Sequence, residues 1–284
     1  MRRFILSLVL MAVATGCAQS QSPPSQAANY TLVWSDNFST LSLCTTNVDG
    51  CKWYYPGLYN FQASGAVTDP YGTYVNLDWT IADNTPTDIS TCSTNGAYCH
   101  AWTFGYFEFS VAFNPVTGSW PALWLMPVAY NKNRVQTGPE LDVLEWKSQT
   151  PTLGYGTIEA MSAGTLLGSA PSTPPNYDTY TFQGGTDLTQ FNTYGVLWTS
   201  SSVSWYFNNV LVETADITVA PFNTQFAGQY PMFIILSQIA GCNNVWYQFT
   251  PCSGQVSPID TKVAWVHVFR DVPSNSTSGT FSIK

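Results

Sequence analysis

Charged side chains are scarce in this sequence, and positive ones are the scarcest. Of 284 residues only 9% are charged, with 9 Lys+Arg against 17 Asp+Glu and a formal net charge of −8. Nine scattered cations do not build the basic face that neutralises phosphates, so we expect no nucleic-acid partner. Because 45% of the residues are hydrophobic, the composition also excludes a disordered chain.

Metal-ligand spacings and helical patterns are lacking too. The sequence has no Cys-x-x-Cys pair, and His100 beside Cys99 is a lone candidate for zinc. No long stretch shows the 3.6-residue period of an amphipathic helix or is rich in Ala, Leu, Glu and Lys. We therefore expect no zinc site, no cofactor and no helical domain.

The first residues are typical of an export signal. Arg2 and Arg3 precede an apolar run from Phe4 to Ala14, which is too short to span a bilayer. The following Ala-Thr-Gly-Cys resembles a bacterial lipobox, which would make Cys17 a lipid-anchored first residue. Ordinary cleavage after Ala18 is the alternative. We expect a signal peptide over 1–17 and a polar Pro/Ser/Gln linker over 18–29.

Six further cysteines indicate disulfides, because an even number in an exported chain is typical of an oxidising compartment. Their connectivity is not fixed by the sequence. The simplest choice is three local loops, which pair Cys44 with Cys51, Cys92 with Cys99, and Cys242 with Cys252.

The rest of the chain reads as short strands separated by Gly, Pro, Asn and Ser. Residues 104–113 alternate between apolar and polar or small positions, and 202–212 form a hairpin around an Asn-Asn turn. Residues 232–236 are continuously apolar, and 263–269 make a last strand. We predict one all-β domain over 30–284, built as two packed antiparallel sheets and monomeric.

The most informative motif is Glu140-Leu141-Asp142-Val143-Leu144-Glu145. In a regular strand Glu140 and Asp142 share one face and Glu145 lies on the other. One extra residue at Val143-Leu144 would bulge the strand and return Glu145 to the first face. Three carboxylates would then lie side by side.

Such crowding is costly, because like charges on one face repel and lose solvent. Acid/base catalysis at a glycosidic bond nevertheless requires carboxyl groups placed close together. A bulge puts the two Glu Cα atoms about 13 Å apart, and their side chains can close to about 5–6 Å, the separation of retaining enzymes. We predict Glu140 as nucleophile, Glu145 as general acid/base and Asp142 between them. A calcium site or a solvated edge strand is the alternative for the motif alone.

The motif and its neighbours resemble glycoside hydrolase family 16, the laminarinase- and lichenase-like β-glycanases with a concanavalin A-like jelly roll. The matching segments are 104–108, 118–127 with Trp-Pro-Ala-Leu-Trp, 140–145, 191–198, 231–236 and 263–269. The resemblance implies a concave substrate cleft, retention of configuration, no catalytic metal, and the same roles for Glu140, Asp142 and Glu145.

Three positions depart from the family pattern. Asn192 and Glu159 stand where laminarinase-like members often have His, near the positive subsites, so substrate preference stays open. Ala264 stands where the last strand often carries an Asp that binds a structural calcium, which weakens the expectation of that ion.

Aromatic rings stack on neutral sugars, so Trp120 is predicted to line subsite −1 or −2. Trp124, four residues on, is predicted for the same face, with the core as its alternative. Further candidates for substrate contact, each weighed against a core or surface role, are Glu108, Asn192, Gln238, Trp102 and His100. Trp146, Trp198 and Trp205 are predicted to be core residues.

The sequence thus favours an endo-acting retaining hydrolase of a β-1,3- or mixed β-1,3/1,4-glucan, outside the cell or anchored at its envelope. Alternatives within the family are a β-galactan hydrolase on an agarose- or carrageenan-like polymer, or a transglycosylase. Few cations disfavour sulfated polymers. The alternative of another class is a lectin-like binding module, which would need neither Glu140 nor Glu145.

Overall fold

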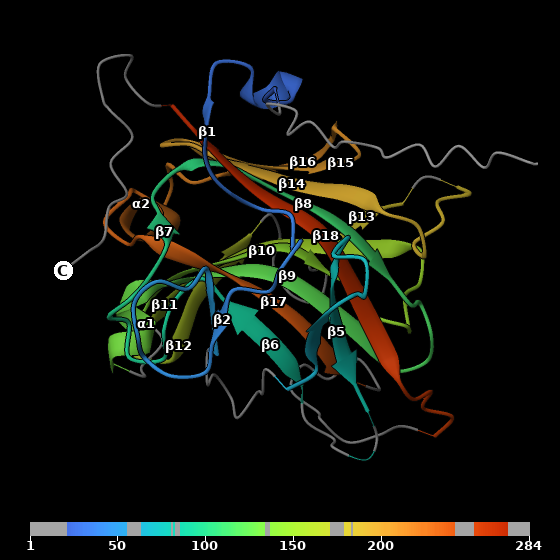
Figure 1. Ribbon diagram of the computed structural model, residues 1–284. Helices are drawn as coiled ribbons and strands as arrows, with labels where there is room; N and C mark the ends of the chain where they lie inside the picture. Colours follow the sequence, from blue (N-terminus) through green and yellow to red (C-terminus); the bar gives the residue numbers. More distant parts are fainter. Residues whose placement is uncertain are drawn as a thin grey trace, which may run out of the picture.

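The computed structural model describes residues 22–55, 64–80, 82, 86–133, 137–170, 179–182, 184–241 and 253–271. The predicted signal peptide and the cysteines at 242 and 252 lie outside these ranges. Two large β-sheets face each other and enclose the main core (Figure 1). This confirms the all-β fold of two packed sheets.

The first layer is an eight-stranded antiparallel sheet. Its strand order is β16-β15-β14-β8-β18-β5-β4, with β1 paired to β18. The bounds are β16 Val210–Asp216, β15 Ser202–Phe207, β14 Asn192–Trp198, β8 Gly105–Phe113, β18 Ile259–Arg270, β5 Val75–Trp79, β4 Ala66–Thr68 and β1 Thr31–Asp36.

The second layer is a ten-stranded sheet in the order β12-β11-β10-β9-β17-β6-β3-β2, with β13 paired to β11 and β7 to β17. Only β2 and β3 pair in parallel among the described strands. The bounds are β12 Thr165–Ala170, β11 Leu153–Ser162, β10 Gly138–Glu145, β9 Ser119–Pro127, β17 Met232–Ala240, β6 Thr87–Ser90, β3 Trp53–Tyr54, β2 Leu43–Cys44, β13 Thr179–Thr181 and β7 Ala101–Trp102.

Helices are few and short in the described ranges: η1 Ser25–Ala27, α1 Val128–Asn133 and α2 Phe222–Gln225. None of the helices in the described part of the chain is long and apolar enough to cross a membrane.

Strand alternation sets which side chains fill the core. In β8, Phe107, Phe109 and Val111 point between the sheets, as the predicted period of two requires. The predicted hairpin is β15 and β16, and its turn residues Asn208 and Asn209 have φ of 47° and 65°. Asparagine tolerates this left-handed conformation, which matches the twist of the strands.

Strand β17 is buried on both faces, as its continuous apolar run predicts. Ile234 and Leu236 enter the core between the sheets. Phe233 and Ile235 face the other way, into a second apolar cluster. The ten-stranded sheet is therefore covered over part of its outer face.

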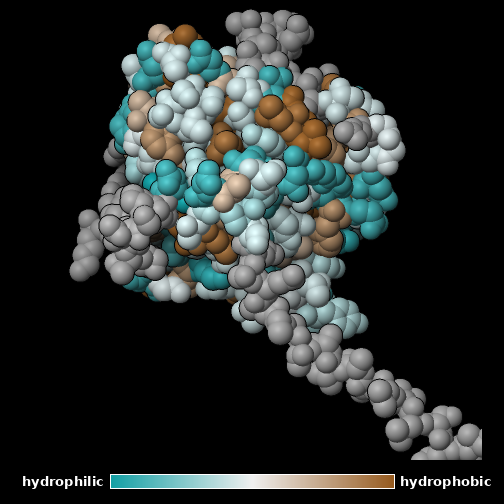
Figure 2. Space-filling model, turned by 90° about the horizontal axis from the view of Figure 1, so that it is seen from above, coloured by the Kyte–Doolittle hydropathy of each residue, from teal (hydrophilic) through white to brown (hydrophobic). Residues whose placement is uncertain are grey.

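The predicted linker is wrong at its end, because residues before 30 already pack on the domain. Ala27 in η1 is buried against Tyr106 and Phe269, and Gln26 Nε2 donates to Tyr106 Oη at 2.6 Å. Figure 2 shows the molecule from above, where hydrophobic residues lie in separate groups among hydrophilic ones.

Candidate functional site

Strand β10 carries the bulge that the acidic motif predicts. Asp142 lies opposite Thr157 and Glu145 opposite Tyr155 on β11, so three steps on one strand face two on the other. The register with β9 shifts by one residue at the same place. As a result Val143 and Leu144, consecutive in sequence, both enter the core with 1% and 0% exposure.

The bulge brings the acids to the outer face of the ten-stranded sheet. Burial raises the pKa of Asp142 well above its ordinary value, and the charges of Glu145, Glu140 and Glu159 raise it further. Glu159 lies directly opposite Glu140 on β11, and burial raises its pKa too. We call these four residues the acidic cluster.

Glu145 is the member best suited to exchange a proton. Burial raises its pKa to about 7, although Lys147 and a hydrogen bond from Trp120 oppose the shift. Trp120 Nε1 donates to Glu145 Oε1 at 3.0 Å. A group with a pKa near 7 is populated in both protonation states at neutral pH.

Lys147 is the cation beside this cluster. Its Nζ lies 5.0 Å from the centre of the Tyr155 ring and 6.0 Å from that of Trp120. Burial lowers its pKa to about 8, against the attraction of Glu145. The lysine, two rings and the acid therefore form one contact group at the end of β10.

Trp124 lies on the predicted face but is buried, and it takes part in a polar chain that the sequence reasoning missed. Trp124 Nε1 donates to Ser237 Oγ at 2.8 Å, and Ser237 Oγ donates to Asp88 Oδ1 at 2.5 Å. Burial raises the pKa of Asp88 well above its ordinary value. An acid within the short run 87–90 was the signal for it.

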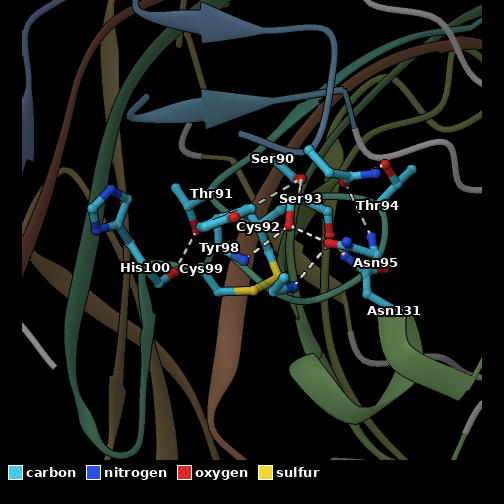
Figure 3. Close-up of a disulfide and its surroundings, with 12 residues drawn as sticks. Ser90, Thr91, Cys92, Ser93, Thr94, Asn95, Tyr98, Cys99, His100 and Asn131 are labelled. Atoms are coloured by element: carbon cyan, nitrogen blue, oxygen red, sulfur yellow. Dashed lines mark hydrogen bonds between the residues drawn. A yellow bond between two sulfur atoms is a disulfide. The ribbon is translucent and has the colours of Figure 1, made fainter. Parts of the chain in front are cut away.

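The Cys92–Cys99 disulfide, drawn in Figure 3, closes a hairpin. The hairpin lies beside the polar chain of Trp124, Ser237 and Asp88. Cys92 packs in the second apolar cluster with Trp124, Phe233 and Ile235, and Asn131 Nδ2 donates to Ser93 O at 3.0 Å. The pairs Cys92–Cys99 and Cys44–Cys51 are both confirmed. The hairpin covers the apolar part of the outer face next to the acids.

Two predicted substrate contacts lie elsewhere, Glu108 because its strand belongs to the other sheet and Gln238 because strand alternation turns it away. Glu108 is on the outer face of the other sheet, where Tyr106 Oη donates to its Oε1 at 3.3 Å. Gln238 is fully buried, and its Oε1 accepts a bond from Thr261 Oγ1 on β18. Both predictions are wrong.

The remaining three candidates also lie away from the acidic cluster. Trp102 packs in the core between the sheets, 6.1 Å from the ring of Phe107. His100 Nε2 lies 3.3 Å from Cys51 O. Asn192 belongs to β14 of the eight-stranded sheet, and its Nδ2 donates to Asp187 O at 3.0 Å. These predictions are corrected to core, loop and turn roles.

Metal ligands do not gather in the described part of the chain, where no three His, Cys, Asp or Glu side chains are arranged to hold an ion. Ala264 lies in β18 and offers no side-chain oxygen. This position therefore supplies no carboxylate to the calcium ion that the resemblance implies.

Comparisons with known proteins concern the family and the fold of this chain. The model of the family "Glycosyl hydrolases family 16" matches residues 76–250. The endo-1,3-1,4-beta-glycanase EglC of Rhizobium meliloti is 28% identical over 217 residues, 66% of this chain and 42% of that protein. The chain thus spans less than half of that relative. A beta-glucanase of Rhodothermus marinus is 26% identical over 226 residues, 71% of each.

A solved structure shares the fold. The laminarinase catalytic domain of Thermotoga maritima superimposes with a TM-score of 0.64 at 18% identity, covering 86% of this chain and 99% of that one. At this identity the likeness concerns the fold, and it supports the predicted jelly-roll sandwich.

Proposed function

This chain belongs to glycosyl hydrolases family 16, and on that premise we propose that it is an endo-acting, retaining hydrolase of β-1,3- or mixed β-1,3/1,4-glucans. The observation that carries the proposal is the bulge in β10, which gathers three acids on one face and leaves Glu145 with a pKa of about 7. The names of the two relatives support the substrate class.

Glu140 is the nucleophile in this proposal, and Glu145 is the acid. In the first step a Glu140 oxygen attacks C1 of the sugar while Glu145 gives its proton to the glycosidic oxygen. The bond between C1 and that oxygen breaks as an ester to Glu140 forms. A proton donor for this step must be protonated near neutral pH, which the raised pKa of Glu145 provides.

In the second step Glu145 takes a proton from water, and the water oxygen displaces Glu140 from C1. Two inversions at C1 give net retention, and both carboxyls return to their first states. Asp142 lies between the two, and its buried carboxyl with a raised pKa can hold a proton toward Glu140. Its role is to orient the nucleophile.

A neutral polymer fits the charge of this face. The acidic cluster repels anionic groups, and Lys147 is already engaged with Glu145 and two rings. Trp120 presents a ring beside Glu145, and we assign it to the sugar nearest the scissile bond.

The test is product analysis on laminarin, lichenan, curdlan, agarose and carrageenan side by side. We expect mixed oligosaccharides from laminarin or lichenan, a fast fall in viscosity, and the β-anomer as first product by NMR. An α-anomer would overturn retention, and release of monosaccharides alone would overturn endo action. Binding without cleavage would instead favour the lectin-like module.

Export is the second part of the proposal. Two disulfides are typical of an oxidising compartment, and we propose that residues 1–17 direct secretion with a lipid on Cys17. Detergent-phase partition of the full chain should fall in Cys17→Ala. Equal partition of both chains would exclude the anchor.

A further inference from the structure

The bulge in β10 needs support, because an extra residue breaks the regular ladder of hydrogen bonds at that point. Without it, strict alternation would turn Glu145 toward the core and away from Glu140 and Asp142. The spacing of the acids therefore depends on whatever holds the bulged backbone in place.

Trp205 reaches this backbone from the opposite sheet. It belongs to β15, is 1% exposed, and its Nε1 donates to the carbonyl oxygen of Asp142 at 2.7 Å. The bond is short, buried and links the two layers of the sandwich next to the register shift. A buried carbonyl that loses its donor is costly to leave unpaired.

Gly156 makes room for the indole. It lies on β11 between Tyr155 and Thr157, the two residues that flank the bulge on the facing strand. A Cβ at Gly156 would lie 2.6 Å from both Cδ1 and Nε1 of Trp205. Any side chain there would push the indole out of its place under the bulge.

We propose that Trp205 is a positioning residue for the hydrolysis: its indole N–H fixes the bulged carbonyl of Asp142 and so sets the distance between Glu140 and Glu145. This inference rests on the proposed function and goes beyond the core role that the sequence predicts for Trp205. The residue acts through backbone and touches no substrate.

Trp198 provides a matched control. It lies on β14 of the same sheet, is 0% exposed, and its Nε1 donates to the carbonyl oxygen of Phe226 at 3.2 Å. Trp198→Phe and Trp205→Phe each remove one buried hydrogen bond from an indole N–H to a backbone carbonyl, and each keeps an aromatic ring. Of these two bonds, only that of Trp205 is made to β10.

The experiment measures kcat, KM, the pH profile and thermal unfolding for both variants on the glucan that the wild type cleaves. We expect similar losses of Tm, while kcat falls about 10- to 100-fold in Trp205→Phe alone, with KM changed less than about 3-fold. Equal kcat in both variants would overturn the inference.

Gly156→Ala tests the same contact if Trp205→Phe does not fold. It should lower kcat with little change in KM. Where Trp205→Phe does fold, Gly156→Ala should add little in its background, because the bond is already lost. An unchanged kcat in Gly156→Ala would count against the inference. A wild type that cleaves no glucan would refute the proposed function instead, whatever the variants do.

Discussion

The outer faces of the two sheets both carry buried or half-buried acids, and they treat them differently. On the eight-stranded sheet Glu108 has Tyr106 as a donor and His267 Nδ1 at 3.8 Å. Asp260 on the same sheet pairs with Lys262 at 3.2 Å. Glu108 and Asp260 thus each have a hydrogen-bonding or oppositely charged partner, although burial and the charge of Asp260 raise the pKa of Asp78 on the same sheet.

On the ten-stranded sheet the four acids of the acidic cluster share the neighbourhood of Lys147 instead. Burial raises the pKa of Asp142, Glu145 and Glu159, and the charges of neighbouring acids raise the pKa of Asp142 and Glu145 further. Crowding of this kind lowers stability and is retained where proton transfer needs it. A raised pKa alone does not identify a catalytic acid, because burial also raises the pKa of Asp78 and Asp88. What distinguishes the acidic cluster is that several such acids crowd one face.

The sharpest way to break the comparison is to remove one acid from each face. Glu140→Ala should lower kcat on the order of 10⁴- to 10⁶-fold with Tm unchanged or raised, because it removes the nucleophile and a repulsion. Glu108→Ala should keep kcat within about 3-fold and lose about 1–3 kcal/mol of stability, because Tyr106 Oη loses its buried acceptor. Activity assays and thermal melts measure both.

Azide or formate distinguishes the role of Glu140 from simple damage. Either anion should enter the space left in Glu140→Ala and restore part of the activity by attacking C1 itself. Failure of both anions to restore any turnover would argue against the nucleophile, and Glu108→Ala should not respond to them.

Glu145→Gln should give the next largest effect. On a glucan the variant cannot protonate the leaving oxygen, so kcat should fall roughly 10²- to 10⁴-fold. On an aryl glycoside whose leaving group departs without a proton, the first step should be nearly spared. Equal losses on both substrates would contradict the acid role.

The sequence predicts the acidic face better than it predicts the residues around it. The bulge follows from Val143 and Leu144, because two consecutive apolar residues must both be buried while Glu145 stays with the other acids. The strands at 104–113 and 263–269 follow from alternation alone. Such local patterns depend on few neighbours.

Side chains placed by tertiary pairing were not predictable in this way. Gln238 and Ser237 are adjacent on β17, yet only Ser237 faces the acids. Glu108 appears on a strand near the motif, but that strand belongs to the other sheet. Which sheet a strand joins is decided by long-range pairing, and no short motif records it.

The raised pKa values on the acidic face also predict a dependence of stability on pH. An acid whose pKa is raised by folding binds its proton more tightly in the folded state. For Glu145 this contribution to stability is fully present below pH about 4 and is lost as the pH rises toward about 7. We expect Tm to fall by a few degrees between pH 5 and 8. Asp142→Asn should reduce that fall.

Comparing the Tm of the wild type and of Asp142→Asn at each pH separates the contribution of the acidic cluster from that of other titrating groups. Burial lowers the pKa of His100, which makes stability rise with pH in an overlapping range, and that contribution is common to both chains. An equal fall in the wild type and Asp142→Asn would show that the crowded acids do not set it.

The smallest expected effect comes from replacing Lys147 beside the acidic cluster, with Lys262 on the other sheet as its control. Lys147 opposes the raised pKa of Glu145, so Lys147→Met should move the alkaline limb of kcat/KM upward by roughly one pH unit, because the acid stays protonated longer. Glu140, Asp142 and Glu159 face the same site and remain in the variant, and the charge of Glu159 raises the pKa of Glu145 further. Lys262, which also lies over a tyrosine ring, pairs with Asp260 on the other face.

Lys262→Met is therefore the matched change, because it removes a lysine charge over a tyrosine ring but involves no acid of the acidic cluster. Its pH profile should coincide with that of the wild type. Loss of the alkaline limb in Lys147→Met would mean that it reports the titration of the lysine itself, whose pKa burial lowers to about 8. An unchanged alkaline limb of kcat/KM would mean that Lys147 packs against the rings of Trp120 and Tyr155 but does not stabilise the charge of Glu145. Methionine can keep that packing although it has no charge.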